Sequence, residues 1–175
     1  MEDKSIATDA IENAKRWLSS SSANAERGSY DLAVYSLEMS IEIALKALVF
    51  STGTDVPKTH SIGDRVTKIV REDVNLARSL GGEIDEFVHT FNSLSTLRSI
   101  SGYIYETRST LDDMRRTYEK FAREVTRIVG LCDKAIRSKK QKRKSFIFYG
   151  ILGSLEEFAR SKIPFLFSTC WSERL

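Results

Sequence analysis

Apolar residues recur at three- and four-residue steps along most of this 175-residue chain. Such spacing gathers them on one side of an α-helix, whereas a half-buried strand would alternate apolar and polar residues. No clear alternation of that kind is present, and only two prolines, at positions 57 and 164, occur. The sequence therefore predicts an all-α protein.

Five helices are expected from the places where the periodicity starts and stops. Serine and glycine clusters mark most boundaries, because these residues favour turns and helix ends. The first helix is expected to end before the serines at 19–22. The expected helices cover about residues 6–18, 29–50, 62–80, 83–101 and 111–136. Their short connections favour an antiparallel four- to five-helix bundle.

The chain is expected to divide into a bundle, residues 1–138, and a C-terminal extension, residues 139–175. Bases crowd positions 134–144, and aromatic residues follow from Phe146. The basic run has two interpretations: a solvated helix end, or a surface that attracts a phosphate backbone. The aromatic segment is expected to pack on the bundle, join a dimer contact or lie on an anionic surface.

Charge and cysteine usage narrow the class of protein only slightly. The net charge is +3, from 27 basic and 24 acidic residues, which does not indicate nucleic acid by itself. Cys132 and Cys170 lack partners at metal-ligand or redox spacing, and Cys132 is expected in the core. With no signal peptide and no apolar span of membrane length, the chain is expected to be soluble and cytoplasmic.

The segment 30–48 is the most informative part of the chain. It is a largely apolar helical run that carries Glu42 and Lys46 four residues apart. On a helix surface such a pair is an ordinary salt bridge worth about 0.2–0.5 kcal/mol. The apolar neighbours also allow a partly buried pair that faces a ligand, so both interpretations stay open.

Four short motifs occur in order and together resemble the HEPN domain family over about residues 10–110. The first precedes the 30–48 segment as Gly-Ser-Tyr-Asp-Leu-Ala, residues 28–33, and the second is Glu42-x-x-x-Lys46-Ala. The third is Pro-x-Thr-His, ending at His60, and the fourth is Tyr105-x-x-Arg108. The resemblance implies a helical bundle, frequent homodimerisation and a cleft for RNA or nucleotides. It also implies, as partner, a small nucleotidyltransferase of a toxin–antitoxin pair.

A binding site is expected where the fourth helix ends. Arg98 and Tyr105 are seven residues apart and thus share a helix face, with Arg108 only slightly rotated. Arginine suits phosphate, and tyrosine adds a stacking surface for a base. The alternative is that these tyrosines are core and the arginines solvated. The candidate nucleotide- or RNA-binding residues are Arg98, Tyr103, Tyr105, Arg108, Glu42, Lys46 and His60.

The sequence favours binding over catalysis. Family ribonucleases place histidine four to six residues after arginine, but here Tyr103 follows Arg98 at that spacing. A phenol with an ordinary pKa near ~10 is a poor base at neutral pH. No catalytic residue, metal or cofactor is expected, and His60 and His89 are interpreted as structural, His89 by packing. Two alternatives remain: a ribonuclease toxin using Tyr103 or His60, and a structural module whose aromatic tail docks a partner.

Overall fold

The computed structural model describes residues 3–56, 62–101 and 111–162, with side chains at 6–56, 62–97 and 111–139. Every element in these ranges is a helix, which confirms the predicted all-α class. The helices are α1 (Asp3–Glu26), α2 (Tyr30–Phe50), α3 (Gly63–Glu72), α4 (Val74–Leu80), α5 (Ile84–Ser101) and α6 (Leu111–Lys162). The chain splits into two compact units, Met1–Lys139 and Lys140–Leu175. The assignment of separate roles to residues 1–138 and 139–175 stays a prediction.

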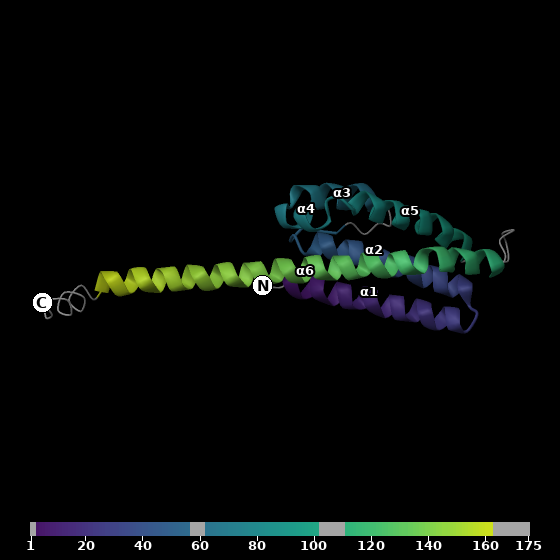
Figure 1. The fold of residues 1–175 in the computed structure, drawn as a ribbon, viewed down its shortest axis with the longest axis horizontal. Coiled ribbons are helices and arrows are strands. Elements are labelled where there is room, and N and C mark those ends of the chain that lie inside the picture. Colours follow the sequence, from purple (N-terminus) through teal and green to yellow (C-terminus); the bar gives the residue numbers. More distant parts are fainter. Residues whose placement is uncertain (1–2, 57–61, 102–110, 163–175) are drawn as a thin grey trace, which may run out of the picture. The chain divides into compact units, whose positions relative to one another are not determined.

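The first unit is a bundle in which α1, α2, α5 and the first part of α6 run alongside one another (Figure 1). Successive long helices run in opposite directions, and the short helices α3 and α4 lie together near the start of α5. Helix α2 contacts α1, α3 and α5. The predicted antiparallel bundle is therefore present, with α2 among its central elements.

Helices α1 and α2 approach closely because small residues line their contact. The Ser21 hydroxyl donates to the carbonyl of Ala33 at 2.7 Å, and the Ser40 hydroxyl donates to that of Ala14 at 2.8 Å. Gly28 turns the chain between the helices with φ +77°, a conformation that glycine adopts without a Cβ clash. These features explain why the serine-rich part of α1 remains helical beside α2.

The core is apolar and continuous within the described side chains. Four large residues of α2 are at most 1% exposed, and each buried side chain of this size contributes about 1.5–3 kcal/mol. These residues are Leu37, Ile41, Leu45 and Leu48. They are joined from α5 by Ile84, Phe87, Phe91 and Leu94, and from α6 by Val125, Ile128, Val129 and Cys132.

Three helix boundaries differ from those the sequence predicted. Helix α1 continues through the serines to Glu26, so the expected end before residue 19 was wrong. The expected third helix is split at Asp73, whose carboxylate caps α4 by accepting from the N–H groups of Asn75 and Leu76 at 3.1 Å. Helix α6 continues beyond residue 136 to Lys162.

Candidate functional site

The acid–base pair of α2 is partly buried. Lys46 Nζ lies 2.5 Å from Glu42 Oε1, and the two side chains are 21% and 3% exposed. A surface salt bridge would leave both groups in water and contribute little. Here the Glu42 carboxylate is withdrawn from solvent into the bundle, while the Lys46 ammonium group lies at the edge of the interior.

A second acid belongs with this pair. Glu38 precedes Glu42 by one helical turn and is completely buried. Both glutamates take part in further polar interactions. Glu38 is absent from the site residues predicted from the sequence, although the four-residue steps from Glu38 to Glu42 to Lys46 place all three along one strip of α2.

Buried carboxylates are costly unless cations or hydrogen bonds compensate them. Replacing Glu38 and Glu42 by apolar residues would suit the core at least as well, because their neighbours Ile41 and Leu45 are fully buried. A polar strip inside an otherwise apolar helix is therefore a candidate functional feature. We call Glu38, Glu42 and Lys46 the α2 polar strip.

Most of the residues expected at the end of the fourth helix lie outside the described part of the chain. Arg98 belongs to α5, whose backbone continues to Ser101, but its side chain is not among those described. Tyr103, Tyr105 and Arg108 fall within residues 102–110, and His60 falls within residues 57–61. Only Glu42 and Lys46 of the expected site are therefore described with their side chains.

The structure corrects the interpretation of His89. From the sequence, His89 is interpreted as an ordinary packing histidine, but its side chain is exposed on α5. The helical spacing explains the error, because Phe87 and Phe91 are buried and His89, two residues after Phe87, lies on the opposite side of the helix. Cys132, by contrast, is buried in the core as expected, and burial raises the pKa of its thiol to about 12.

Two bases of the 134–144 run form ion pairs with the bundle. Arg137 pairs with Asp133 at 2.6 Å and with Glu12 at 2.8 Å, and Lys139 reaches Asp73 at 2.6 Å. Lys134 is exposed, and the side chains from residue 140 onward lie outside the described part. Arg137 and Lys139 thus form ion pairs with acids of the bundle, which weakens the phosphate-attraction interpretation for this stretch.

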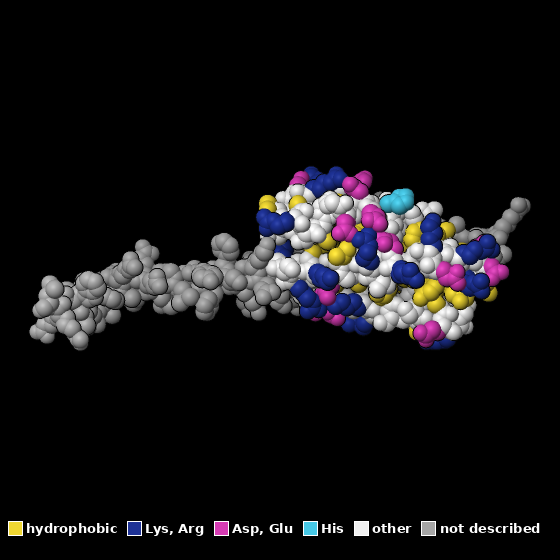
Figure 2. All heavy atoms as spheres, viewed as in Figure 1, with side chains coloured by type: hydrophobic (Ala, Val, Ile, Leu, Met, Phe, Trp, Pro, Cys, Tyr) yellow, Lys and Arg dark blue, Asp and Glu magenta, His cyan; other side chains and the backbone are white. Residues whose placement is uncertain are grey.

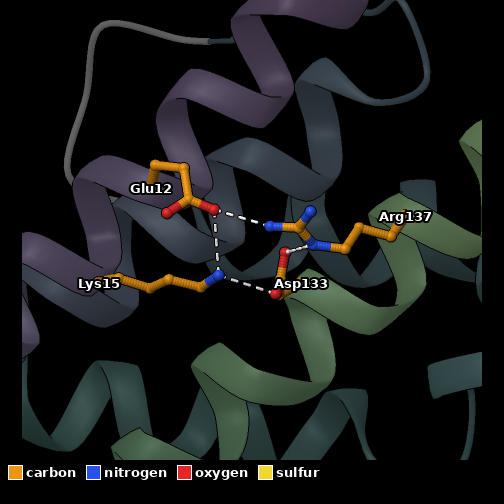
Figure 3. Close-up of polar contacts among 4 residues, drawn as sticks. All are labelled: Glu12, Lys15, Asp133 and Arg137. Atoms are coloured by element: carbon orange, nitrogen blue, oxygen red, sulfur yellow. Dashed lines mark hydrogen bonds and ion pairs between the residues drawn. The ribbon is translucent and has the colours of Figure 1, made fainter.

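Four residues form a network that joins α1 to α6 (Figure 3). Lys15 donates to Asp133 at 2.8 Å and to Glu12 at 3.1 Å, and Arg137 closes the ring through the same two acids. The hydrogen bond to Asp133 is the main cause that raises the pKa of Lys15. Burial alone would raise the pKa of Asp133, but Lys15 and Arg137 outweigh it and hold that pKa below 3.8.

A second set of ion pairs joins α6 to α5. Arg127 bonds Glu83, lies 3.0 Å from Glu86 and is held by Glu124 at 2.7 Å. Hydrogen bonds from Glu124 and Glu83 raise the pKa of Arg127. Its guanidinium also sits 5.7 Å from the centre of the Phe87 ring, so it covers the edge of the core.

The described surface offers no concentrated basic face in the view of Figure 2, where acidic and basic side chains are interspersed. Two grooves of about 500 and 530 Å³ flank α3, and both mix acids with bases. Residues common to the two are Asp64, Lys68 and Glu72. Among the described side chains, no group of three or more residues is arranged to hold a metal ion.

Comparison with known proteins identifies the class. The profile of the HEPN domain family matches residues 7–135, most of the chain and nearly all of the bundle. The chain therefore belongs to the HEPN domain family. Neither the search of curated proteins nor that of solved structures gave a match. Among the helices that the structure describes, none has the length and apolar character needed to span a membrane.

Proposed function

We propose that this HEPN protein binds a nucleotide or RNA and acts with a nucleotidyltransferase partner in a toxin–antitoxin-type pair. We further propose that it works as a homodimer in the cytoplasm. The observation that carries the proposal is the partly buried Glu42–Lys46 pair in a domain of this family. An exposed pair of this kind would contribute little to stability, whereas a partly buried pair fits a site that holds a charged ligand.

Lys46 is suited to contact phosphate. Its ammonium group has three N–H donors, of which Glu42 accepts one. The carboxylate fixes the position of the ammonium, so less side-chain freedom is lost when a phosphate oxygen binds. Glu42 therefore acts as an organising group and Lys46 as a contact.

Arg98 is the proposed second phosphate contact. It follows Leu94 by four residues, and Leu94 follows Phe91 and Phe87 on the buried side of α5. This spacing predicts that Arg98 shares a helical face with Leu94. Tyr105 and Arg108 complete the proposed site by stacking on a base and binding phosphate, with Tyr103 and His60 near them.

Binding is proposed rather than RNA cleavage because Tyr103 stands where the family's ribonucleases carry histidine. An imidazole titrates near neutral pH and can exchange a proton with a ribose hydroxyl, whereas an ordinary phenol stays protonated. Tyr103 is therefore assigned a hydrogen-bonding or stacking contact.

Isothermal titration calorimetry tests the proposal with ATP and, separately, a short single-stranded RNA. We expect at least one of them to bind, and Arg98→Ala to weaken that binding about tenfold or more, as expected for a lost charge-assisted contact. Arg123→Ala, which removes an exposed arginine of α6, serves as the matched control and should bind normally. Absence of binding by both ligands would refute the proposal, and so would an unchanged affinity in Arg98→Ala.

A further inference from the structure

Helix α2 is apolar on its outward side as well as on its inward side. Its only charged residues are Asp31, Glu38, Glu42 and Lys46, and both glutamates are buried. A bundle helix normally turns charged and polar residues to solvent, and a helix that is apolar all round is usually covered all round. The outward side of α2 therefore needs an explanation that the bundle itself does not give.

Four residues define this outward side, which we call the α2 outer stripe: Leu32, Tyr35, Met39 and Ile43. They follow one another at steps of three and four, so they share one face of the helix. Leu32 is 52% exposed, and the other three are half-buried. Trp17 of α1 extends the surface by packing edge-on to Tyr35, with ring centres 6.1 Å apart.

We propose that a second copy of this chain packs its α2 outer stripe against this one in antiparallel orientation, about a two-fold axis near Met39. In that register Tyr35 of one copy meets Ile43 of the other, and the two Met39 side chains face each other. Closed dimers of this kind use the same patch on both subunits. The stripe is rich in aromatic and methionine side chains and poor in charge, as the centres of protein interfaces are.

Charge placement favours a second copy over other occupants. Asp31 and Lys46 stand at opposite ends of the stripe, roughly 22 Å apart at about 1.5 Å per residue. The midpoint between them falls beside Met39, so the two-fold axis that pairs the apolar residues also brings Asp31 of each copy near Lys46 of the other, whose ammonium group keeps two N–H donors besides the one that Glu42 accepts. Nucleic acid would require an excess of bases on this face, which the stripe does not have.

This inference rests on the homodimer proposed above but not on the ligand. Cross-linking tests the surface directly, in a Cys170→Ser background so that the engineered thiol is the reactive one. Cys132 does not compete, because it is buried and its thiol pKa is raised to about 12. With diamide as oxidant, Met39→Cys is expected to give a disulfide-linked dimer, since the two side chains meet at the axis. Ser79→Cys, on the exposed side of α4, is the matched control and should stay unlinked.

Light scattering after size exclusion provides the second measurement. The unsubstituted chain is expected to be dimeric, and Met39→Arg to raise the dimer dissociation constant at least about tenfold while circular dichroism stays helical. If Met39→Arg fails to fold, the cross-link decides alone. If the chain is dimeric but Met39→Cys does not cross-link and Met39→Arg does not weaken the dimer, the proposed interface is wrong. The proposal of a homodimer would then still stand. A monomeric unsubstituted chain would overturn both, while the calorimetric ligand test stands apart from either outcome.

Discussion

Helix α2 and helix α6 are attached to the rest of the bundle by different chemistry. Where α1 meets α2, neutral serine hydroxyls donate to backbone carbonyls, and alanines allow the helices to approach closely. Where α6 meets α1, α4 and α5, ion pairs lie at the edge of the apolar contact. Both attachments bury apolar side chains, so the difference lies at their edges.

This difference determines how each attachment responds to its surroundings. A buried hydroxyl-to-carbonyl bond carries no net charge, and neither salt nor moderate pH changes it. Half-exposed ion pairs are screened by salt and lost when one partner changes its protonation state. We therefore expect α6 to be the part of the bundle whose attachment depends on solution conditions.

The largest effect is expected in the apolar core that both attachments share. Leu37→Ala should lower the free energy of unfolding by about 2–5 kcal/mol, because it leaves a cavity beside fully buried neighbours. Leu111→Ala makes the same change at a residue that is 56% exposed and should stay within about 0.5 kcal/mol of the unsubstituted chain. Urea denaturation measures both, and equal losses would contradict the placement of the core.

A smaller loss is expected when the α1–α6 network is broken. Asp133→Asn removes the partner of Lys15 and Arg137 and should cost roughly 1–2 kcal/mol at low salt. At about 1 M NaCl, where the Debye length is about 3 Å, most of that loss should disappear. Glu119→Gln, at an exposed acid of the same helix, is the control and should change little. A loss independent of salt would argue against an ionic role.

The α1–α2 contact should behave in the opposite way. Ser40→Ala removes the hydroxyl that donates to Ala14, with an expected loss of about 0.5–1.5 kcal/mol. The same loss should be measured at low salt and at about 1 M NaCl, because no charge is involved. A strong salt dependence here would remove the distinction between the two attachments.

Acid should weaken the α6 attachment in a defined direction. The pKa values of Asp133 and Asp73 are held below their ordinary 3.8 in the folded protein, despite burial that would raise them. The stabilisation is therefore present above pH ~4 and lost as pH falls through the lower, folded values. The difference between Asp133→Asn and the unsubstituted chain, measured by urea denaturation, should shrink below that pH. A difference that grows as the pH falls would contradict the direction of these pKa shifts.

Local signals in the sequence predicted much of this architecture. The bounds of α2 were recovered almost to the residue, because Gly28 and Gly53 lie just beyond its ends and both adopt positive φ. The buried apolar residues that the structure describes in α5, which are Ile84, Phe87, Phe91 and Leu94, recur at the three- and four-residue steps on which the helix prediction rests. The polar strip was only half recognised, since Glu38 was overlooked although it repeats the four-residue step of Glu42 and Lys46.

What could not be predicted depends on residues far apart in the chain. Helix α1 continues through its serines because Ser21 bonds Ala33 of another helix, and no local pattern shows this. Arg137 pairs with Glu12 across 125 residues of sequence. The positive charge of the basic run is therefore partly neutralised by an acid that the local sequence does not show. The exposed position of His89, by contrast, follows from the local spacing of Phe87 and Phe91 along α5.

The most direct test of the central claim, that the α2 polar strip serves ligand binding, is the thermal shift caused by the bound nucleotide or RNA. The double variant Glu42→Gln with Lys46→Met keeps the shape of the pair and removes its charges, while Lys120→Met removes an exposed lysine of α6. We predict that the ligand raises Tm in the unsubstituted chain and in Lys120→Met, and leaves it unchanged in the double variant. An equal rise in all three proteins would contradict the assignment.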